Sequence, residues 1–456
     1  MLVLPDQILG VAKLLKKGED CYLVGGAVRD LLCGREILDY DFVCDFDPRI
    51  LARRLADYLG GNFYVMDEKR LTCRVISGGN SDTDIFYDFA QMQGNLLADQ
   101  RARDFTINSM AVALQGQEQV IDPLKGGHDL QEKWLRPCAE LSFDSDPVRV
   151  IRAVRYAVDL NLKIEPGTKA LLSNAVEKLD LVSIERKRDE FFKILENPKA
   201  YIALTLMEQF GIAAKLGIPV SKDNLDHLRM YELLVNSLLQ AGGKQQRDYF
   251  TAATFYSALA VFRASLQHFF YDRNSCNHSR IQLGKFAAIR WDFPTSPVDE
   301  NDLVTSFSNE ELKLLQNCSD HTDLIIELLN QDGGIDNRTA YKLFRRVGEY
   351  SIDLILLALA RLSGVPAAEL DQRKWLAALS NAAKLLDLWF FHPETSRPQP
   401  FLDGTEIMQK LNLEAGQLIG QLLEELKEEQ AAGEIKDQKS ALIWIKNRLN
   451  QIKALQ

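Results

Sequence analysis

The chain has 456 residues, of which 46% are hydrophobic and 26% are charged, so it is long enough for several domains and has an ordinary globular composition. Its net charge of −10 excludes a general electrostatic attraction to nucleic acid, so any such contact must come from a local basic surface. The seven cysteines form no CxxC or Cys/His zinc pattern, no apolar run is long enough to span a bilayer, and the N-terminal stretch lacks the order of a signal peptide. We therefore expect a cytoplasmic protein with reduced thiols and no membrane contact.

The N-terminal part of the chain predicts a small sheet with helices. An amphipathic helix is expected over residues 5–17 and another over 49–59, where Asp47-Pro48 is typical of a helix start. Residues 62–66, 72–76 and 84–89 have the composition of strands. Beyond residue 200 the pattern is almost entirely helical, with helices expected over 200–216, 223–241, 248–270, 309–330, 337–347, 350–363, 370–387 and 405–450.

A glycine turn near the N-terminus has the form of a phosphate-binding site. The apolar run Cys21–Val24 predicts a buried strand, Gly25 and Gly26 follow it, and a helix is expected over residues 27–32. Backbone N–H groups and the helix dipole at such a helix start suit a phosphate group. A plain tight turn is the alternative interpretation of a glycine pair.

Three carboxylates on predicted strands could bind a metal. Asp39 and Asp41 are two residues apart on a strand over 39–43, so their side chains point to the same face and repel each other. A divalent cation would relieve that repulsion. Asp88 lies on the strand over 84–89 and is a candidate third carboxylate, with a solvated strand face as the alternative.

Two further segments combine arginine with aspartate. Residues 101–110 read RARDFTINSM, in which Asp104 could cap a helix. Asp146 precedes Pro147 and is expected to be the N-cap of a helix whose arginines recur every three residues, at 149, 152 and 155. A solvated basic face is one interpretation, and the other is a nucleotide site, because an aspartate and an arginine on a rigid helix can hydrogen-bond the Watson–Crick edge of a base.

Five segments, taken in chain order, resemble the motifs of the tRNA nucleotidyltransferase/poly(A) polymerase family, the class II nucleotidyltransferases. They are VGGAVRD, DYD, RARDFTINSM, DPVRVIRAVRY and SIERKRDE. The C-terminal segments around Leu402-Asp403-Gly404, Gly416 and Gly433 resemble the tail of the same family. The resemblance implies an α+β protein with a catalytic head over residues 1–138 that contains a small mixed β-sheet. It also implies an all-α remainder, with a nucleotide-recognising neck over 139–204 and a tRNA-binding body and tail over 205–456.

The resemblance also implies roles for individual residues. Asp39 and Asp41 would hold Mg²⁺, with Asp88 as a further catalytic carboxylate. The nucleotide would be bound by residues of four segments: Gly25, Gly26 and Arg29; Arg103 and Asp104; Asp146 and Arg149, which would read the base of CTP or ATP; and Arg152 and Arg155 at the phosphates. The chain departs from the family pattern at Ala102, where an arginine is usual, and at Ser145, where a glutamate is usual. The helix that contains SIERKRDE is expected to brace the nucleotide-recognition helix.

The function implied is template-independent transfer of CMP, AMP or both from a nucleoside triphosphate to the 3′ end of tRNA, with release of pyrophosphate. A poly(A) polymerase, a non-catalytic RNA-binding protein on the same fold and a metal-dependent phosphohydrolase are the alternatives, and the lack of a His-rich metal cluster disfavours the last.

In members of the family that complete CCA, a flexible loop between the third head strand and the motif matched by RARDFTINSM helps to switch the site from CTP to ATP, whereas members that add only CC have a short form. Here that interval is only residues 90–100, so the resemblance implies the short form. We therefore expect addition of CC only, with a separate A-adding enzyme acting on the same tRNA. Basic residues at 244–247 and 276–290 suit an RNA backbone, and solvated helix ends are the alternative.

Overall fold

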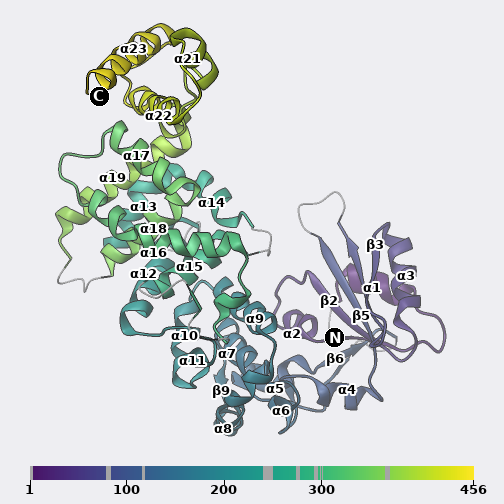
Figure 1. The fold of residues 1–456 in the computed structure, drawn as a ribbon. Helices are drawn as coiled ribbons and strands as arrows, with labels where there is room; N and C mark the ends of the chain where they lie inside the picture. The colour runs from purple at the N-terminus through teal and green to yellow at the C-terminus, as the bar shows by residue number, and fades with distance from the viewer. Residues whose placement is uncertain are drawn as a thin grey trace. The chain divides into compact units, whose positions relative to one another are not determined.

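The computed structural model describes residues 4–78, 84–115, 119–239, 250–273, 278–291, 296–297, 299, 301–364 and 370–455. The chain divides into two compact units (Figure 1). The first contains Met1–Phe191 and Leu206–Lys215, and the second contains Phe192–Thr205 and Leu216–Gln456. The α+β class expected from the sequence is confirmed, whereas the boundaries predicted between head, neck and body stay a prediction.

The first unit contains a mixed sheet of seven strands in the order β3-β4-β5-β2-β1-β6-β7. The strands are β1 (Cys21–Val24), β2 (Asp39–Cys44), β3 (Asn62–Asp67), β4 (Thr72–Ser77), β5 (Ile85–Gln91), β6 (Ala111–Ala113) and β7 (Val120–Ile121). β2 and β5 are parallel and the other neighbours are antiparallel. The sequence did not predict β6 and β7, because two or three residues show no recognisable alternation.

Three helices cover one face of this sheet: α1 (Asp6–Lys13), α2 (Gly26–Leu32) and α3 (Pro48–Leu59). Their apolar side chains share one core with alternate strand residues such as Leu23, Phe42 and Phe89. As expected, Asp47 caps α3, its carboxylate accepting from the backbone N–H of Arg49 at 3.0 Å. Because side chains alternate along a strand, Asp39, Asp41 and Asp88 belong to the opposite face, where the described residues form a small apolar group around Val43.

The rest of the first unit is mostly helical. It contains α4 (Leu96–Ala102), η1 (Thr106–Asn108), α5 (Gly126–Glu132), β8 (Trp134–Leu135), α6 (Ser142–Ser145), α7 (Arg149–Asp159), β9 (Lys163–Ile164), α8 (Pro166–Ala175), η2 (Val176–Leu181), the start of α9 (Ile184–Glu196) and α11 (Ile212–Lys215). The expectation that Asp146 caps the next helix was wrong. α7 begins at Arg149, its N-cap is Val148, and no side chain caps it. The Asp146 carboxylate instead binds Arg186.

Helices make up the second unit in the described residues. After α10 (Ala200–Gln209) they are α12 (Lys222–Leu239), α13 (Phe250–Leu259), η4 (Ala260–Phe262), α14 (Arg263–Tyr271), α15 (Arg280–Arg290), η5 (Leu303–Ser306), α16 (Asn309–Leu329), α17 (Asn337–Val347), η6 (Gly348–Tyr350), α18 (Ser351–Ser363), α19 (Gln372–Phe391), α20 (Pro393–Ser396), α21 (Gly404–Leu411), α22 (Gln417–Ala431) and α23 (Gln438–Leu455). The single helix expected over 405–450 is three helices in the structure. Asn412 ends α21 and Gly433 lies just after α22, and both residues have positive φ values that interrupt a helix. None of the described helices is long and apolar enough to cross a membrane.

Two cations of the basic segment over 276–290 are buried in ion pairs and so are not available to an RNA backbone. Lys285 is paired with Glu232 at 3.2 Å, and Arg290 with Asp302 at 3.0 Å. Both cations are buried, and the helix that carries them, α15, was not predicted. The other basic segment, Lys244–Arg247, lies outside the described residues.

Candidate active site

The glycine turn after β1 brings three separate segments together. Gly25 has a φ of 76°, a backbone conformation that favours glycine. A Cβ atom at Gly25 would lie 2.9 Å from Oδ2 of Asp41 and 3.4 Å from Nη1 of Arg103. The predicted phosphate-binding turn, the carboxylate strand and the RARDFTINSM segment therefore meet at this point.

The predicted carboxylates lie on neighbouring strands. β2 and β5 run parallel with Asp41 opposite Asp88, and Asp39 lies two residues before Asp41 on the same face of β2. Burial, and then the charges of Asp88 and Asp39, raise the pKa of Asp41 to about 6, although Arg103 acts in the opposite direction. The three carboxylates therefore form one mutually repelling group.

The three carboxylates differ in their partners. Asp88 is bound by Arg74 through two hydrogen bonds of 2.7 Å, so its charge is already compensated. Within the described part of the chain, neither Asp39 nor Asp41 accepts a hydrogen bond or forms an ion pair. The described residues hold no preformed cluster of three metal ligands, but two carboxylates with added phosphate oxygens are a donor set suited to Mg²⁺. Asp39 and Asp41 thus fit a divalent cation better than Asp88 does.

Arg29, on α2, is buried and already has protein partners. Its Nη1 donates to Oδ1 of Asn108 at 2.6 Å, and its Nε and Nη2 donate to Asp30 at 2.9 and 2.7 Å. Its guanidinium carbon lies 5.5 Å from the ring centre of Tyr156 in α7. Arg29 therefore braces the start of α2 against η1 and the neck, and its contact with phosphate stays a prediction.

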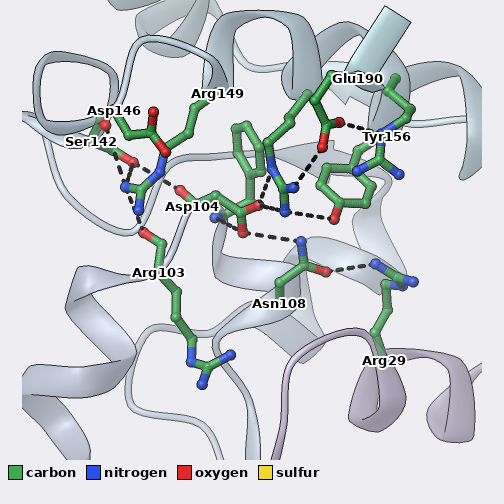
Figure 2. Close-up of polar contacts among 12 residues, drawn as sticks. Arg29, Arg103, Asp104, Asn108, Ser142, Asp146, Arg149, Tyr156 and Glu190 are labelled. Carbon is green, nitrogen blue, oxygen red and sulfur yellow. Dashed lines mark hydrogen bonds and ion pairs between the residues drawn. The ribbon is translucent and has the colours of Figure 1, made fainter. Parts of the chain in front are cut away.

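Asp104 is the centre of a buried network (Figure 2). Its Oδ2 accepts from Nε and Nη2 of Arg152 at 3.0 and 2.6 Å, and its Oδ1 accepts from Nδ2 of Asn108 at 3.1 Å. Burial alone would raise the pKa of Asp104, but the charge and hydrogen bonds of Arg152 hold it below its ordinary value. Asp104 therefore joins the RARDFTINSM segment to the neck helix α7 as a carboxylate.

A residue that the sequence did not single out, Glu190 of α9, holds two of the neck arginines. Its carboxylate oxygens accept from Nη1 of Arg152 and from Nε of Arg155, each at 3.0 Å (Figure 2). Asp104 and Glu190 thus compensate the charges of both arginines, whose predicted contact with phosphate stays a prediction. The expectation that the SIERKRDE helix braces the recognition helix agrees with this contact.

Arg149 is held differently, because the oxygens that accept its hydrogen bonds in the described residues are neutral. Its Nη2 donates to the Ala102 carbonyl at 2.7 Å, and its Nη1 donates to the Arg103 carbonyl at 3.2 Å and to the Ser142 hydroxyl at 2.8 Å. In Figure 2 the backbone carbonyl of Arg103 points to Arg149, whereas the guanidinium of Arg103 points the opposite way. Asp146 lies beside Arg149, and its carboxylate accepts from Nη2 of Arg186 at 3.1 and 2.9 Å.

Two family models match the chain. The "Poly A polymerase head domain" matches residues 21–136, and the "Probable RNA and SrmB- binding site of polymerase A" matches residues 161–219. A strand–glycine turn–helix beside paired carboxylates, followed by an arginine-rich neck, is the arrangement of a nucleotidyltransferase. Over these residues the chain is similar to the tRNA nucleotidyltransferase/poly(A) polymerase family.

Curated relatives extend the similarity along the whole chain. A CC-adding tRNA nucleotidyltransferase of Synechocystis sp. is 28% identical over 430 residues, 92% of each chain. An A-adding tRNA nucleotidyltransferase of Deinococcus radiodurans is 28% identical over 91% of this chain and 92% of the relative. A CC-adding enzyme of Geobacter sulfurreducens is 36% identical over 47% of this chain and 48% of its own length. Among solved structures, a CCA-adding enzyme in complex with CTP covers 98% of this chain and 96% of its own, with a TM-score of 0.65 and 23% identity, a similarity of fold.

Proposed function

We propose that this protein transfers CMP from CTP to the 3′ hydroxyl of a tRNA that lacks its terminal nucleotides, releasing pyrophosphate. The observation that carries the proposal is the uncompensated pair Asp39 and Asp41 beside the glycine turn, in the same compact unit as the neck residues Asp146 and Arg149. The CC-adding relatives support this reaction.

Asp39 and Asp41 would hold Mg²⁺, which would supply the charge needed to activate the 3′ hydroxyl and to neutralise the triphosphate. Their shared face and mutual repulsion suit that role. The backbone of Gly25 and Gly26 at the start of α2 would bind phosphate oxygens, because nothing larger than glycine fits beside Asp41 at residue 25. Arg103 would add a positive charge next to the same turn.

The hydrogen bonds of Arg149 leave two donors for a base. A guanidinium has five N–H groups, and the protein contacts of Arg149 use Nη1 and one N–H of Nη2. Nε–H and the second N–H of Nη2 remain as a fork of two parallel donors, which matches the adjacent acceptors O2 and N3 of cytosine. The Asp146 carboxylate would accept from the cytosine amino group, which is a donor.

The link between β5 and α4 supports the restriction to cytidine. β5 ends at Gln91 and α4 begins at Leu96, and of the four residues between them Asn95 already caps α4, its Oδ1 accepting from the backbone N–H of Ala98 at 2.9 Å. This capped connection is too short to move and to change the orientation of the Asp146 and Arg149 side chains so that they bind ATP. A separate A-adding enzyme would then complete the same tRNA. The A-adding relative makes AMP transfer the second candidate function.

One experiment separates these functions. The protein is incubated with Mg²⁺ and three tRNAs, one lacking CCA, one ending in C and one ending in CC, with CTP and ATP singly and together, and the products are sequenced. We expect products that end in CC. AMP added to the tRNA ending in CC would identify an A-adding or complete CCA-adding enzyme. Long A tails on unrelated RNA would identify a poly(A) polymerase, and no transfer at all would refute the proposal.

A further inference from the structure

The base-reading arginine of the neck is fixed without a carboxylate. Five hydrogen bonds hold the guanidinium of Arg149, and their acceptors are the carbonyls of Ala102, Arg103 and Ser142 and the hydroxyls of Ser142 and Ser145. Across the residues that the structure describes, no acidic group lies within ion-pair distance of Arg149. Its positive charge is therefore undiminished, which strengthens the hydrogen bonds that its remaining donors can make to a base.

The shortest of the bonds to Nη1 is the one to the Ser142 hydroxyl, at 2.8 Å, whereas those to Arg103, to the Ser142 carbonyl and to Ser145 are 3.2, 3.3 and 3.5 Å. The same hydroxyl donates to the carbonyl of Asp104 at 3.1 Å. A hydroxyl has one proton to donate, so the bond to Asp104 directs a lone pair of Ser142 toward Arg149. Ser142 is 3% exposed, so water cannot easily replace it.

We propose that Ser142 is a positioning residue for base recognition, whose hydroxyl sets the direction of the Arg149 fork and couples it to the Arg103-Asp104 backbone. This inference rests on the proposed function and deepens it. Without the hydroxyl, Nη1 keeps only acceptors at 3.2 Å or more, and the guanidinium can turn. The Nε and Nη2 donors then lose their alignment with cytosine O2 and N3, and discrimination against uracil, which presents an N–H at N3, is weakened.

The test compares Ser142→Ala with Ser237→Ala. Ser237 is also 3% exposed, and its hydroxyl also donates to a backbone carbonyl, that of Leu234 at 2.7 Å, but it lies in α12 of the second unit. For each variant, kcat/KM is measured with CTP and with UTP on tRNA lacking CCA, together with the melting temperature. We expect the CTP-to-UTP ratio to fall about tenfold in Ser142→Ala, the size of one lost hydrogen bond to a charged group, and to stay at the wild-type value in Ser237→Ala.

A second pair of variants separates positioning from folding. Ser145 already reaches Nη1 at 3.5 Å, so Ser145→Glu places a carboxylate where it can hold Arg149. In the Ser145→Glu background, adding Ser142→Ala should leave the CTP-to-UTP ratio unchanged. The comparison of these two variants tests the inference even if Ser142→Ala alone does not fold. The inference is overturned if Ser142→Ala leaves the CTP-to-UTP ratio unchanged. It is also overturned if Ser142→Ala lowers that ratio tenfold equally in the wild-type and the Ser145→Glu background. Neither result affects the proposed function. A wild-type protein that transfers no CMP refutes the proposed function, and this inference with it.

Discussion

Replacing Gly25 by alanine should disable the active site far more than it destabilises the fold. Gly25 has φ 76° and ψ −147°, a conformation open almost only to glycine, and forcing another residue into it costs roughly 1–3 kcal/mol. The added Cβ would also lie 2.9 Å from Oδ2 of Asp41, closer than a Cβ can approach, so the carboxylate must move. Because a misplacement of about 1 Å at a reacting group can cost on the order of a hundredfold in rate, we expect at least that loss of CMP transfer.

Gly34→Ala is the matched control for this prediction. Gly34 also has a positive φ, 64°, but a Cβ there would meet no atom within 4 Å. The Gly34→Ala variant should therefore have backbone strain of roughly 1–2 kcal/mol and keep a near-wild-type rate of CMP transfer. Single-turnover CMP addition and thermal unfolding are measured for both variants. If Gly25→Ala loses no more activity than Gly34→Ala, the close approach of the turn to Asp41 is irrelevant to catalysis and the reasoning fails.

Three further predictions concern the carboxylates and the neck. Asp39→Ala or Asp41→Ala should slow CMP transfer on the order of a thousandfold with an unchanged circular dichroism spectrum, and near-normal turnover would exclude either residue as a metal ligand. Arg149→Ala should relax the preference for CTP, measured as the ratio of kcat/KM for CTP and UTP; a drop in melting temperature with no change in that ratio would mean a structural role only. Glu190→Gln should lower the free energy of unfolding in urea by about 1–3 kcal/mol, because the carboxylate that two neck arginines share becomes a neutral amide, and a change below about 0.5 kcal/mol would contradict this.

The parts of the site that the sequence could predict depend on local geometry. A strand followed by two glycines and a helix can adopt few backbone conformations. The side-chain period of two along a strand puts Asp39 and Asp41 on one face, whatever the rest of the chain does. Some helices were also predictable from their pattern: residues 337–347 form α17 as expected, and in the structure Asp336 caps it.

The parts that could not be predicted depend on contacts between distant segments. Glu190 lies 38 residues from Arg152, and although the resemblance implied that its helix braces the recognition helix, it did not show which side chains meet. Asp146 precedes a proline, which is typical of a helix cap, yet its carboxylate binds Arg186, 40 residues away, so a tertiary contact overrides the local preference. Ser142 lies on a helix of four residues, too short to have a sequence signal, and its part in holding Arg149 follows only from the fold.

A buried aspartate in the second unit gives a prediction about pH. Asp353 of α18 is buried, and its nearest cation is Arg280, with Nη1 at 3.1 Å from Oδ2. Burial raises the pKa of Asp353 to about 7; Arg280 acts in the opposite direction, and Glu349 adds a smaller rise. The other titratable groups influenced by it are Tyr231 and Cys318, whose pKa values are raised well above their ordinary values by burial, so both stay neutral while Asp353 titrates.

The sign of the effect follows from proton binding. In the unfolded chain Asp353 loses its proton near its ordinary pKa of 3.8, whereas in the folded chain it keeps the proton up to about pH 7. Between these values the folded state binds more protons, so the contribution of Asp353 to stability is present in acid and is lost as the pH rises. At 1.36 kcal/mol per pKa unit, the loss between about pH 4.5 and about pH 7.5 is about 3 kcal/mol.

Asp353→Asn isolates this contribution, because asparagine resembles the protonated acid and does not titrate. The free energy of unfolding in urea is measured for both proteins at each pH, and the value of the variant is subtracted from that of the wild type. We expect this difference to fall by about 3 kcal/mol as the pH rises from about 4.5 to about 7.5, and the subtraction removes the effect of all other titrating groups that the two proteins share. A difference that is constant with pH would show that Arg280 keeps the carboxylate charged throughout, and that the ion pair outweighs burial at this position.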